Sequence, residues 1–409
     1  MSPQSPKTLA LDNAIVSPFT FTGNTKEYFK IWIVNTLLTI VTLGIYSAWA
    51  KVRNKQYLYK NTWVKGASFE YHGKPTKILV AYFIALGLLL VYELILPYLI
   101  SMLFAEVSAL PIKLGDLHFA IEPEDVELIL GFLGLLLVLV WVPVLARMFT
   151  ARLSSYQNIR FDFKTTWQEA CKVLFVLGFF GGVTIIGYPY FAYRRAEFFV
   201  NHSRYGTTPF ALASNPKTFY AIYFKTFLIG LGGLISILAA GLAILFMNEN
   251  RAFIDEFVKI ILGIFLGPLF WFFYVATSSY LNTSVANFTW SNTTMGTHQF
   301  IGAPQGDIFG KIQVRKVSGP AFAFNCSVKV SRVIWIRMSN TLANLLSLGL
   351  LIPWGTIRME NYRLSCLSLL ATSDSDQFIE SEKKKVTATG EGMADIYGIN
   401  PFTTTDLNI

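Results

Sequence analysis

The sequence predicts an all-α polytopic membrane protein with four long spanning helices, three shorter elements in a repeated arrangement and a small cytoplasmic β element. The first observation is composition, because 53% of the residues are hydrophobic and 14% are charged. Soluble proteins contain roughly 25% charged residues. The second observation is the length of the apolar runs, which suits a roughly 30 Å hydrocarbon layer. The third is a motif that recurs along the chain.

Four apolar runs have the character of spanning helices. They are long and dominated by Leu, Ile, Val, Phe and Gly, which a helix surrounded by lipid requires. These runs begin at Ile78, Leu128, Phe219 and Val258. Three other runs are shorter or more polar, and they begin at Ile31, Val173 and Thr341. We predict that each of these three segments forms a re-entrant element, lies at the membrane interface or spans the membrane.

The charges between the runs predict which loops face the cytoplasm. Acidic loops follow the second and fifth runs, whereas Lys and Arg concentrate after the first, third, fourth and sixth. Cytoplasmic loops carry the excess of Lys and Arg. Four spans with three elements that return on the cytoplasmic side satisfy this rule and place both termini inside. Seven spans are the alternative, and they would break the rule at several loops.

The net charge of +9 has two interpretations. Nucleic acid binding would require a basic face on a soluble fold, which the sequence lacks. We therefore expect membrane lipids as the partner, with anionic headgroups at the cytoplasmic face.

A motif in the first short run returns in the last one at a constant spacing without gaps. Asn35, Gly44, Trp49 and Arg53 correspond to Asn340, Gly349, Trp354 and Arg358. With Tyr46, the aromatic and glycine residues form an interfacial motif, because amphipathic rings favour headgroup depth. The simplest interpretation is an anchor at the cytoplasmic interface. The alternative is that Arg53 and Arg358, with Asn35 and Asn340, bind an anionic ligand or lipid headgroup.

The recurrence divides the chain into five parts. We expect a cytoplasmic N-terminal segment (1–30), a first membrane repeat unit (31–150) and a second (151–281). A β-like segment with the third motif copy follows (282–370), then a polar C-terminal tail (371–409). We expect the tail to be disordered because it is polar and mixed in charge.

The most unusual residue is Glu93, which lies among leucines near the middle of a predicted span. A charged carboxylate facing lipid there costs at least about 2.5 kcal/mol, so it needs a partner, a cavity or a proton. Glu93 is a candidate ion site, or it forms a hydrogen bond to a neighbouring helix.

No set of residues predicts catalysis, a cofactor or a metal site. The four histidines have no ligand spacing, and no phosphate-binding loop or nucleophile elbow occurs. Cys171, Cys326 and Cys366 show no disulfide or zinc pattern, so we expect free thiols.

Several sequence segments resemble those of the YjgN-like family of bacterial inner-membrane proteins. They include Thr42-Leu43-Gly44-Ile45-Tyr46, Trp49-Ala50-Lys51-Val52-Arg53 and Pro353-Trp354, and the resemblance extends from about Phe19 to Tyr362. It implies a multi-pass protein of the bacterial inner membrane, in a family whose activity is unknown. The sequence departs from the family pattern at Ser347-Leu348-Gly349, where threonine is usual.

Two functions follow as expectations. The repeats, the short elements and Glu93 favour a transporter or channel-like protein for a small solute or ion. The interfacial aromatic and arginine residues favour the alternative, a non-enzymatic protein that organises the membrane or interacts with lipid.

Overall fold

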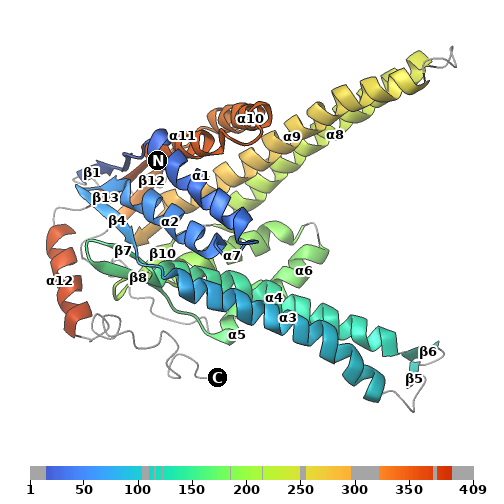
Figure 1. Ribbon diagram of the computed structural model, residues 1–409, viewed down its shortest axis with the longest axis horizontal. Coiled ribbons are helices and arrows are strands. Elements are labelled where there is room, and N and C mark those ends of the chain that lie inside the picture. Colours follow the sequence, from blue (N-terminus) through green and yellow to red (C-terminus); the bar gives the residue numbers. More distant parts are fainter. Residues whose placement is uncertain are drawn as a thin grey trace, which may run out of the picture.

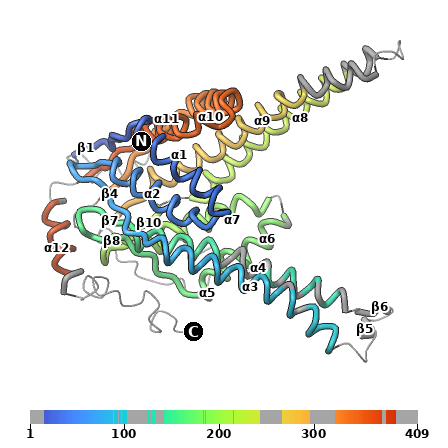
Figure 2. The backbone as a smooth tube through the Cα atoms, in the orientation of Figure 1, coloured from blue at the N-terminus to red at the C-terminus, as the bar shows by residue number. Residues whose placement is uncertain are grey.

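The computed structural model describes residues 15–103, 110–114, 117–121, 123–184, 186–213, 215–248, 255–295, 322–371 and 375–388. Two pairs of long helices extend from a central β-structure, and some of the shorter helices lie between the pairs in this view (Figure 1). In each pair the chain leaves one strand and returns to a neighbouring one (Figure 2).

An antiparallel sheet of eleven strands forms the centre. Its strands lie in the order β1-β13-β12-β11-β10-β9-β8-β7-β4-β3-β2. Their bounds are β1 Ile15–Pro18, β2 Thr20–Phe21, β3 Thr62–Val64, β4 Ala67–Tyr71, β7 Ser154–Tyr156, β8 Ile159–Phe163, β9 Ser203–Tyr205, β10 Thr208–Leu212, β11 Thr293–Met295, β12 Phe322–Cys326 and β13 Leu367–Ala371.

The sheet curls into a nearly closed barrel. Its two terminal strands, β1 and β2, are separated in the chain by Phe19 alone. The Phe19 N–H donates to the carbonyl of Leu367, and the Thr22 N–H donates to that of Asn61. One bent segment of chain therefore joins both ends of the sheet, which limits the exposed strand edges.

Tight turns connect the strands within the barrel. Lys65 and Gly66 between β3 and β4 have φ values of 48° and 76°, and Gln157 and Asn158 between β7 and β8 have 50° and 65°. Two consecutive residues with positive φ give the turn that matches the right-handed twist of a hairpin. These turns set the pairing of Trp63 with Ser68.

Apolar and aromatic side chains fill the barrel. The buried members of this cluster are Phe19, Val64, Tyr156, Ile159, Tyr205, Met295, Phe322, Leu369, Ala371, Phe378 and Ile379. The tyrosine hydroxyls still find partners, since Tyr156 donates to the Val64 carbonyl at 2.8 Å and Tyr205 to the Tyr156 carbonyl at 3.0 Å. Satisfying these groups removes the cost of burying a polar atom.

The long helices are α3 (Pro75–Leu103) with α4 (Pro123–Arg152), and α8 (Pro216–Asn248) with α9 (Asp255–Asn292). A two-stranded ribbon, β5 (Leu110–Leu114) with β6 (Leu117–Ile121), lies between α3 and α4 in the chain. The second pair is closely packed, because a Cβ added at Gly233 would lie 2.6 Å from the Phe273 ring.

The predicted all-α fold with four spanning helices is wrong in both respects. The first error is that the protein contains a β-barrel. The sequence did not predict it, because strands of two to five residues are too short to show clear alternation of apolar and polar residues. Within the described residues, only Pro75–Met102 and Pro216–Leu242 are long and apolar enough to cross a membrane. Apolar content alone does not separate a lipid-facing helix from one packed on a neighbour, as α9 is on α8.

The shorter helices form three groups, each between two strands. The first group is α1 (Thr25–Val41) with α2 (Ser47–Lys60), and the last is α10 (Val330–Leu346) with α11 (Ile352–Ser365). The middle group contains α5 (Trp167–Ala170), a π-helix (Cys171–Val176), α6 (Leu177–Val183) and α7 (Tyr188–Asn201). The three predicted short runs therefore leave the barrel and return to it.

Helix α12 (Ser375–Ala388) lies at the side of the barrel away from the long helices (Figure 1). Phe378 and Ile379 belong to the buried cluster, and Lys65 forms an ion pair with Asp376 at 2.9 Å. This part of the tail is thus ordered, contrary to the expectation of disorder. Its polar composition hides an amphipathic helix with a buried apolar side.

Glu382 attaches α12 to the barrel through a fully buried side chain. Its carboxylate accepts hydrogen bonds from the Thr207 N–H and hydroxyl, the Thr208 hydroxyl and the Lys385 ammonium. Burial alone would raise the pKa of Glu382, but these donors outweigh burial and lower the pKa below its ordinary value of 4.5.

We predict that Glu382→Gln weakens the docking of α12 by about 1–3 kcal/mol, because one acceptor oxygen becomes an NH2 group that faces other donors. A lowered carboxyl pKa stabilises the folded state above the unfolded pKa, and this stabilisation is lost as pH falls through the folded pKa. Hydrogen-exchange protection of 375–388, corrected for intrinsic rates, should therefore fall in acid in the parent protein. Glu380→Gln, at an exposed position of α12, is the control. Unchanged protection in the Glu382 variant would contradict this role.

Candidate functional site: the paired helix hairpins

The first and last helix hairpins, α1–α2 and α10–α11, turn through the same backbone conformation. Leu43 and Leu348 have φ values of 49° and 51°, and the following Gly44 and Gly349 have 92° and 88°. Positive φ at both positions explains the glycine, which adopts this region without a steric cost. The predicted motif thus specifies a tight turn between two helices.

A hydroxyl closes each turn. The Thr42 Oγ1 accepts a hydrogen bond from the Tyr46 N–H at 3.0 Å, and the Ser347 Oγ accepts one from the Leu351 N–H at 3.1 Å. The departure from threonine at Ser347 therefore preserves the contact, because both residues supply the same acceptor.

Large apolar side chains surround both turns and face outward. Leu43 and Leu348 are each 94% exposed. Their exposed neighbours are Leu37, Ile40, Val41, Ile45, Leu342, Leu345, Leu346, Leu350, Leu351 and Ile352. Contiguous apolar patches of this kind mark surfaces that another apolar phase covers.

Asn35 and Asn340, predicted as ligand residues, hold the two helices of each hairpin together. Asn35 is 2% exposed, and its Nδ2 donates to the Asn54 Oδ1 at 3.1 Å. The Asn340 Nδ2 donates to the carbonyl of Gly355 at 3.0 Å. Both contacts connect the outgoing helix to the returning one, so these asparagines act within the protein.

Gly355 allows this contact because it has no side chain. An added Cβ would lie 3.0 Å from the Asn340 Nδ2 and 3.1 Å from its Cγ. We predict that Gly355→Ala lowers the free energy of unfolding by about 1–3 kcal/mol, the usual cost of overpacking. Thermal unfolding in detergent measures this, with Gly232→Ala as the control, since a Cβ there meets nothing within 4 Å. Equal melting temperatures for the two variants would refute the steric argument.

Arg53 and Arg358 lie over aromatic rings in the returning helices. The Arg53 guanidinium is 5.9 Å from the Tyr46 ring centroid, and that of Arg358 is 5.0 Å from the Trp354 centroid. Arg358 also donates to the Ser339 hydroxyl at 2.6 Å and to the Asn340 Oδ1 at 3.1 Å. Arg358 therefore serves partly to join α10 and α11, whereas Arg53 is exposed.

A tyrosine fixes the base of each hairpin in the same way. The Tyr57 hydroxyl accepts from the Asn24 N–H at 2.7 Å and donates to the Asn24 carbonyl at 2.9 Å. The Tyr362 hydroxyl makes the corresponding pair with the Lys329 N–H and carbonyl, at 2.9 and 3.3 Å. The constant spacing of the motif also relates Tyr57 to Tyr362.

The middle helix group departs from this geometry. Gly187 precedes α7 with a φ of −76°, and residue 185 is outside the described chain. A π-helix replaces regular α-helix at Cys171–Val176. The middle group therefore does not repeat the turn of the other two hairpins.

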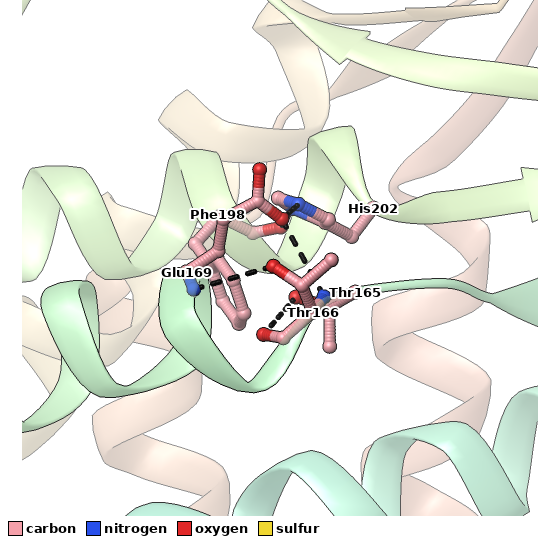
Figure 3. A network of polar contacts seen from close by, with 5 residues as sticks. All are labelled: Thr165, Thr166, Glu169, Phe198 and His202. Carbon is pink, nitrogen blue, oxygen red and sulfur yellow. Dashed lines mark hydrogen bonds and ion pairs between the residues drawn. The ribbon is translucent and has the colours of Figure 1, made fainter. Parts of the chain in front are cut away.

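A histidine and a glutamate join the ends of the middle group (Figure 3). The His202 Nδ1 lies 2.8 Å from the Phe198 carbonyl, and its Nε2 lies 3.2 Å from the Glu169 Oε2. Because Nδ1 must donate to the carbonyl, Nε2 donates to the carboxylate only when the imidazole is protonated. Burial raises the pKa of Glu169, but hydrogen bonds from His202 and Thr166 outweigh it and lower the pKa. This pair connects α5 to the end of α7.

The chain matches a family model described as "bacterial protein of unknown function (DUF898)" over residues 16–306 and 309–396. It belongs to this DUF898 family. A relative named inner membrane protein YjgN from Escherichia coli K12 is 53% identical over 53 residues, 13% of each chain. The Salmonella typhimurium LT2 protein of the same name is 28% identical over 160 residues, 38% of this chain and 34% of the relative. No solved structure matches.

These matches confirm the resemblance to the YjgN-like family. The alignments span 13% and 34% of the length of these two relatives. The relatives' names and the two apolar helices support an inner-membrane location for this DUF898 protein.

Glu93 lies in α3, but its side chain is outside the described part of this DUF898 protein. Its predicted ion site stays a prediction. Within the described residues, no group of three or more His, Cys, Asp or Glu side chains is arranged to hold a metal ion. The features that the structure brings together are thus the apolar turns and the polar contacts beneath them.

Proposed function

We propose that this DUF898 protein is a non-enzymatic inner-membrane protein that organises lipid, with the turns of α1–α2 and α10–α11 inserted among acyl chains. The observation that carries this proposal is the nearly complete exposure of Leu43 and Leu348 at the two turns. Burying a leucine side chain contributes about 1.5–3 kcal/mol. Both turns present several such side chains, so contact with lipid stabilises the protein more than contact with water.

The residues beside the turns suit the membrane interface. The rings of Tyr46 and Trp49 stack with centroids 5.9 Å apart, and Lys51 donates to the Tyr82 hydroxyl at 2.6 Å. Aromatic rings concentrate at headgroup depth, and nearby cations are attracted to anionic lipid. From the turn along α2, leucine is followed by aromatic rings and then by cations. This order matches the acyl chains, the interface and the anionic headgroups of one lipid leaflet.

We place the barrel on the cytoplasmic side of the membrane. This location includes β1 and β13, the first and last strands of the described chain. Support comes from the Lys and Arg content of the segments that build the barrel and the returning helices, since positive residues are retained inside. A multi-pass arrangement, with α3 and α8 as the two candidate spans, is part of this proposal.

Transport of a small solute or ion is the second candidate. Glu93 favours it, because a carboxylate within an apolar helix marks an ion path in many membrane proteins. The packed side chains of the barrel favour lipid organisation instead, since they occupy the interior within the described residues.

Photolabelling from within the bilayer tests the proposal. The protein is reconstituted with a phosphatidylcholine that carries a diazirine on its acyl chain, and labelled peptides are identified by mass spectrometry. We expect labelling of 37–46 and 342–352, and none of the β3–β4 hairpin. Unlabelled turns beside labelled α3 and α8 would overturn the proposal while showing that reconstitution succeeded.

A further inference from the structure

The first and last hairpins share a backbone but differ at the base of their outgoing helices. In the first hairpin, internal partners satisfy this base. The Asn24 side chain accepts from the Lys26 N–H at 2.8 Å and so caps α1. The Thr22 hydroxyl donates to the Asn61 Oδ1 at 3.0 Å, and the Tyr57 hydroxyl lies 3.3 Å from Glu27.

The same positions in the last hairpin carry different chemistry. By the constant spacing of the motif, Lys329 takes the place of Asn24, and Arg332 takes that of Glu27. The N-cap residue Lys329 makes no side-chain hydrogen bond to α10. A capping oxygen and a carboxylate are thus both replaced by cations, although Asn, Asp and Ser are the favoured caps.

A groove of about 550 Å³ lies at the base of α10, where these replacements occur. Its polar lining includes Ser327, Lys329, Ser331, Arg332, Tyr362 and Ser365. Within the described part of the chain, no carboxylate pairs with the Lys329 ammonium or the Arg332 guanidinium. The groove therefore combines two cations and several hydroxyl donors with no carboxylate in its lining. The corresponding positions of the first hairpin also carry cations, Lys26, Lys30 and Lys60, but they include the carboxylate of Glu27.

We propose that this groove binds a phosphate group, carried either by an anionic lipid headgroup or by a soluble phosphate. A guanidinium donates two parallel hydrogen bonds to phosphate, and the ammonium and serine hydroxyls supply further donors. The lipid source rests on the proposed function, while the soluble source does not. Trp335, an exposed residue of α10 that also lines the groove, offers a flat apolar wall for the remainder of the ligand.

The position of the groove allows both sources. Helix α10 has 17 residues, which span about 25 Å at a rise of 1.5 Å per residue. One leaflet with its headgroups is about 20–22 Å thick. If the Leu348 turn reaches the middle of the bilayer, the groove lies at the outer edge of the headgroup layer.

Protection of Lys329 from acetylation tests the proposal in the full-length protein. Three preparations in an uncharged maltoside detergent are compared: detergent alone, detergent with phosphatidylglycerol, and detergent with inorganic phosphate in solution. Mass spectrometry measures the reactivity of Lys329, with the exposed Lys26 on α1 as the internal reference. By mass action, a ligand at about four times its Kd lowers the reactivity about fivefold.

Protection with phosphatidylglycerol alone identifies a lipid headgroup, and protection with inorganic phosphate identifies a soluble ligand; either result supports the phosphate site. Arg332→Gln should abolish the protection, whereas Lys30→Gln, the same loss of charge at an exposed position of α1, should preserve it. Equal reactivity of Lys329 in all three preparations, or protection that survives Arg332→Gln, would overturn the site. Photolabelling of the turns would be unaffected by that failure, so the two proposals are separable.

Discussion

Replacing Leu43 and Leu348 together with aspartate should remove both hairpin turns from the lipid. Moving from leucine to aspartate changes the insertion free energy by roughly 3–4 kcal/mol at the centre of a bilayer. We therefore expect acyl-chain photolabelling of both turns to disappear. The long helices should still hold the protein in the membrane fraction, and detergent-extracted protein should retain its melting temperature.

The matched control is the double variant Leu43→Phe and Leu348→Phe, which keeps both turns apolar. It should be labelled like the parent protein, because its side chains still favour lipid. If the aspartate variant is labelled as strongly as the phenylalanine variant, the two leucines do not hold the turns in the acyl layer.

Phe163→Ala should lower the free energy of unfolding by about 3–5 kcal/mol, the range for deleting a buried aromatic ring. Phe163 is completely buried at the end of β8, in a cluster with Val144, Val173 and Phe198. Its ring centroid lies 6.1 Å from that of Phe198 in an edge-on arrangement. This cluster joins a barrel strand to the base of α4 and to α7, so its loss should loosen the middle helix group.

Denaturation in detergent, followed by intrinsic fluorescence, measures this change. Phe180→Ala removes the same ring at a position that is 65% exposed, and should cost little. A Phe163 variant no less stable than the Phe180 variant would show that the cluster does not couple the barrel to the helices.

The recurring motif was the most informative feature of the sequence. Its two glycines, Gly44 and Gly349, both adopt positive φ in turns between two helices. The barrel escaped prediction because its strands come from segments far apart in the chain. β2 pairs with β3 across all of α1 and α2, so no local alternation reveals the ladder.

The candidate ligand residues were harder to interpret. Asn35, Asn340 and Arg358 were predicted to face a ligand. Each donates a hydrogen bond to the neighbouring helix of its own hairpin, although the buried Asn35 Oδ1 has no partner within the described residues. A sequence does not show whether a polar side chain has a hydrogen-bond partner within the protein. The groove at Lys329 could have been found by extending the alignment of the two motif copies toward the N-terminus. At the position of Asn24, which caps α1, the second copy has the cation Lys329.

The depth of residue 348 in a bilayer tests most directly whether the hairpin turns insert among the acyl chains. A fluorescent probe is attached to Leu348→Cys in a variant whose Cys171, Cys326 and Cys366 are replaced by serine, with Lys60→Cys as the exposed comparison at the opposite end of α2 from the turn. We predict that a quencher on the lipid acyl chain quenches the probe at 348, and that iodide in water quenches the probe at 60. Equal quenching of both probes by iodide would place the turn in water and contradict the account.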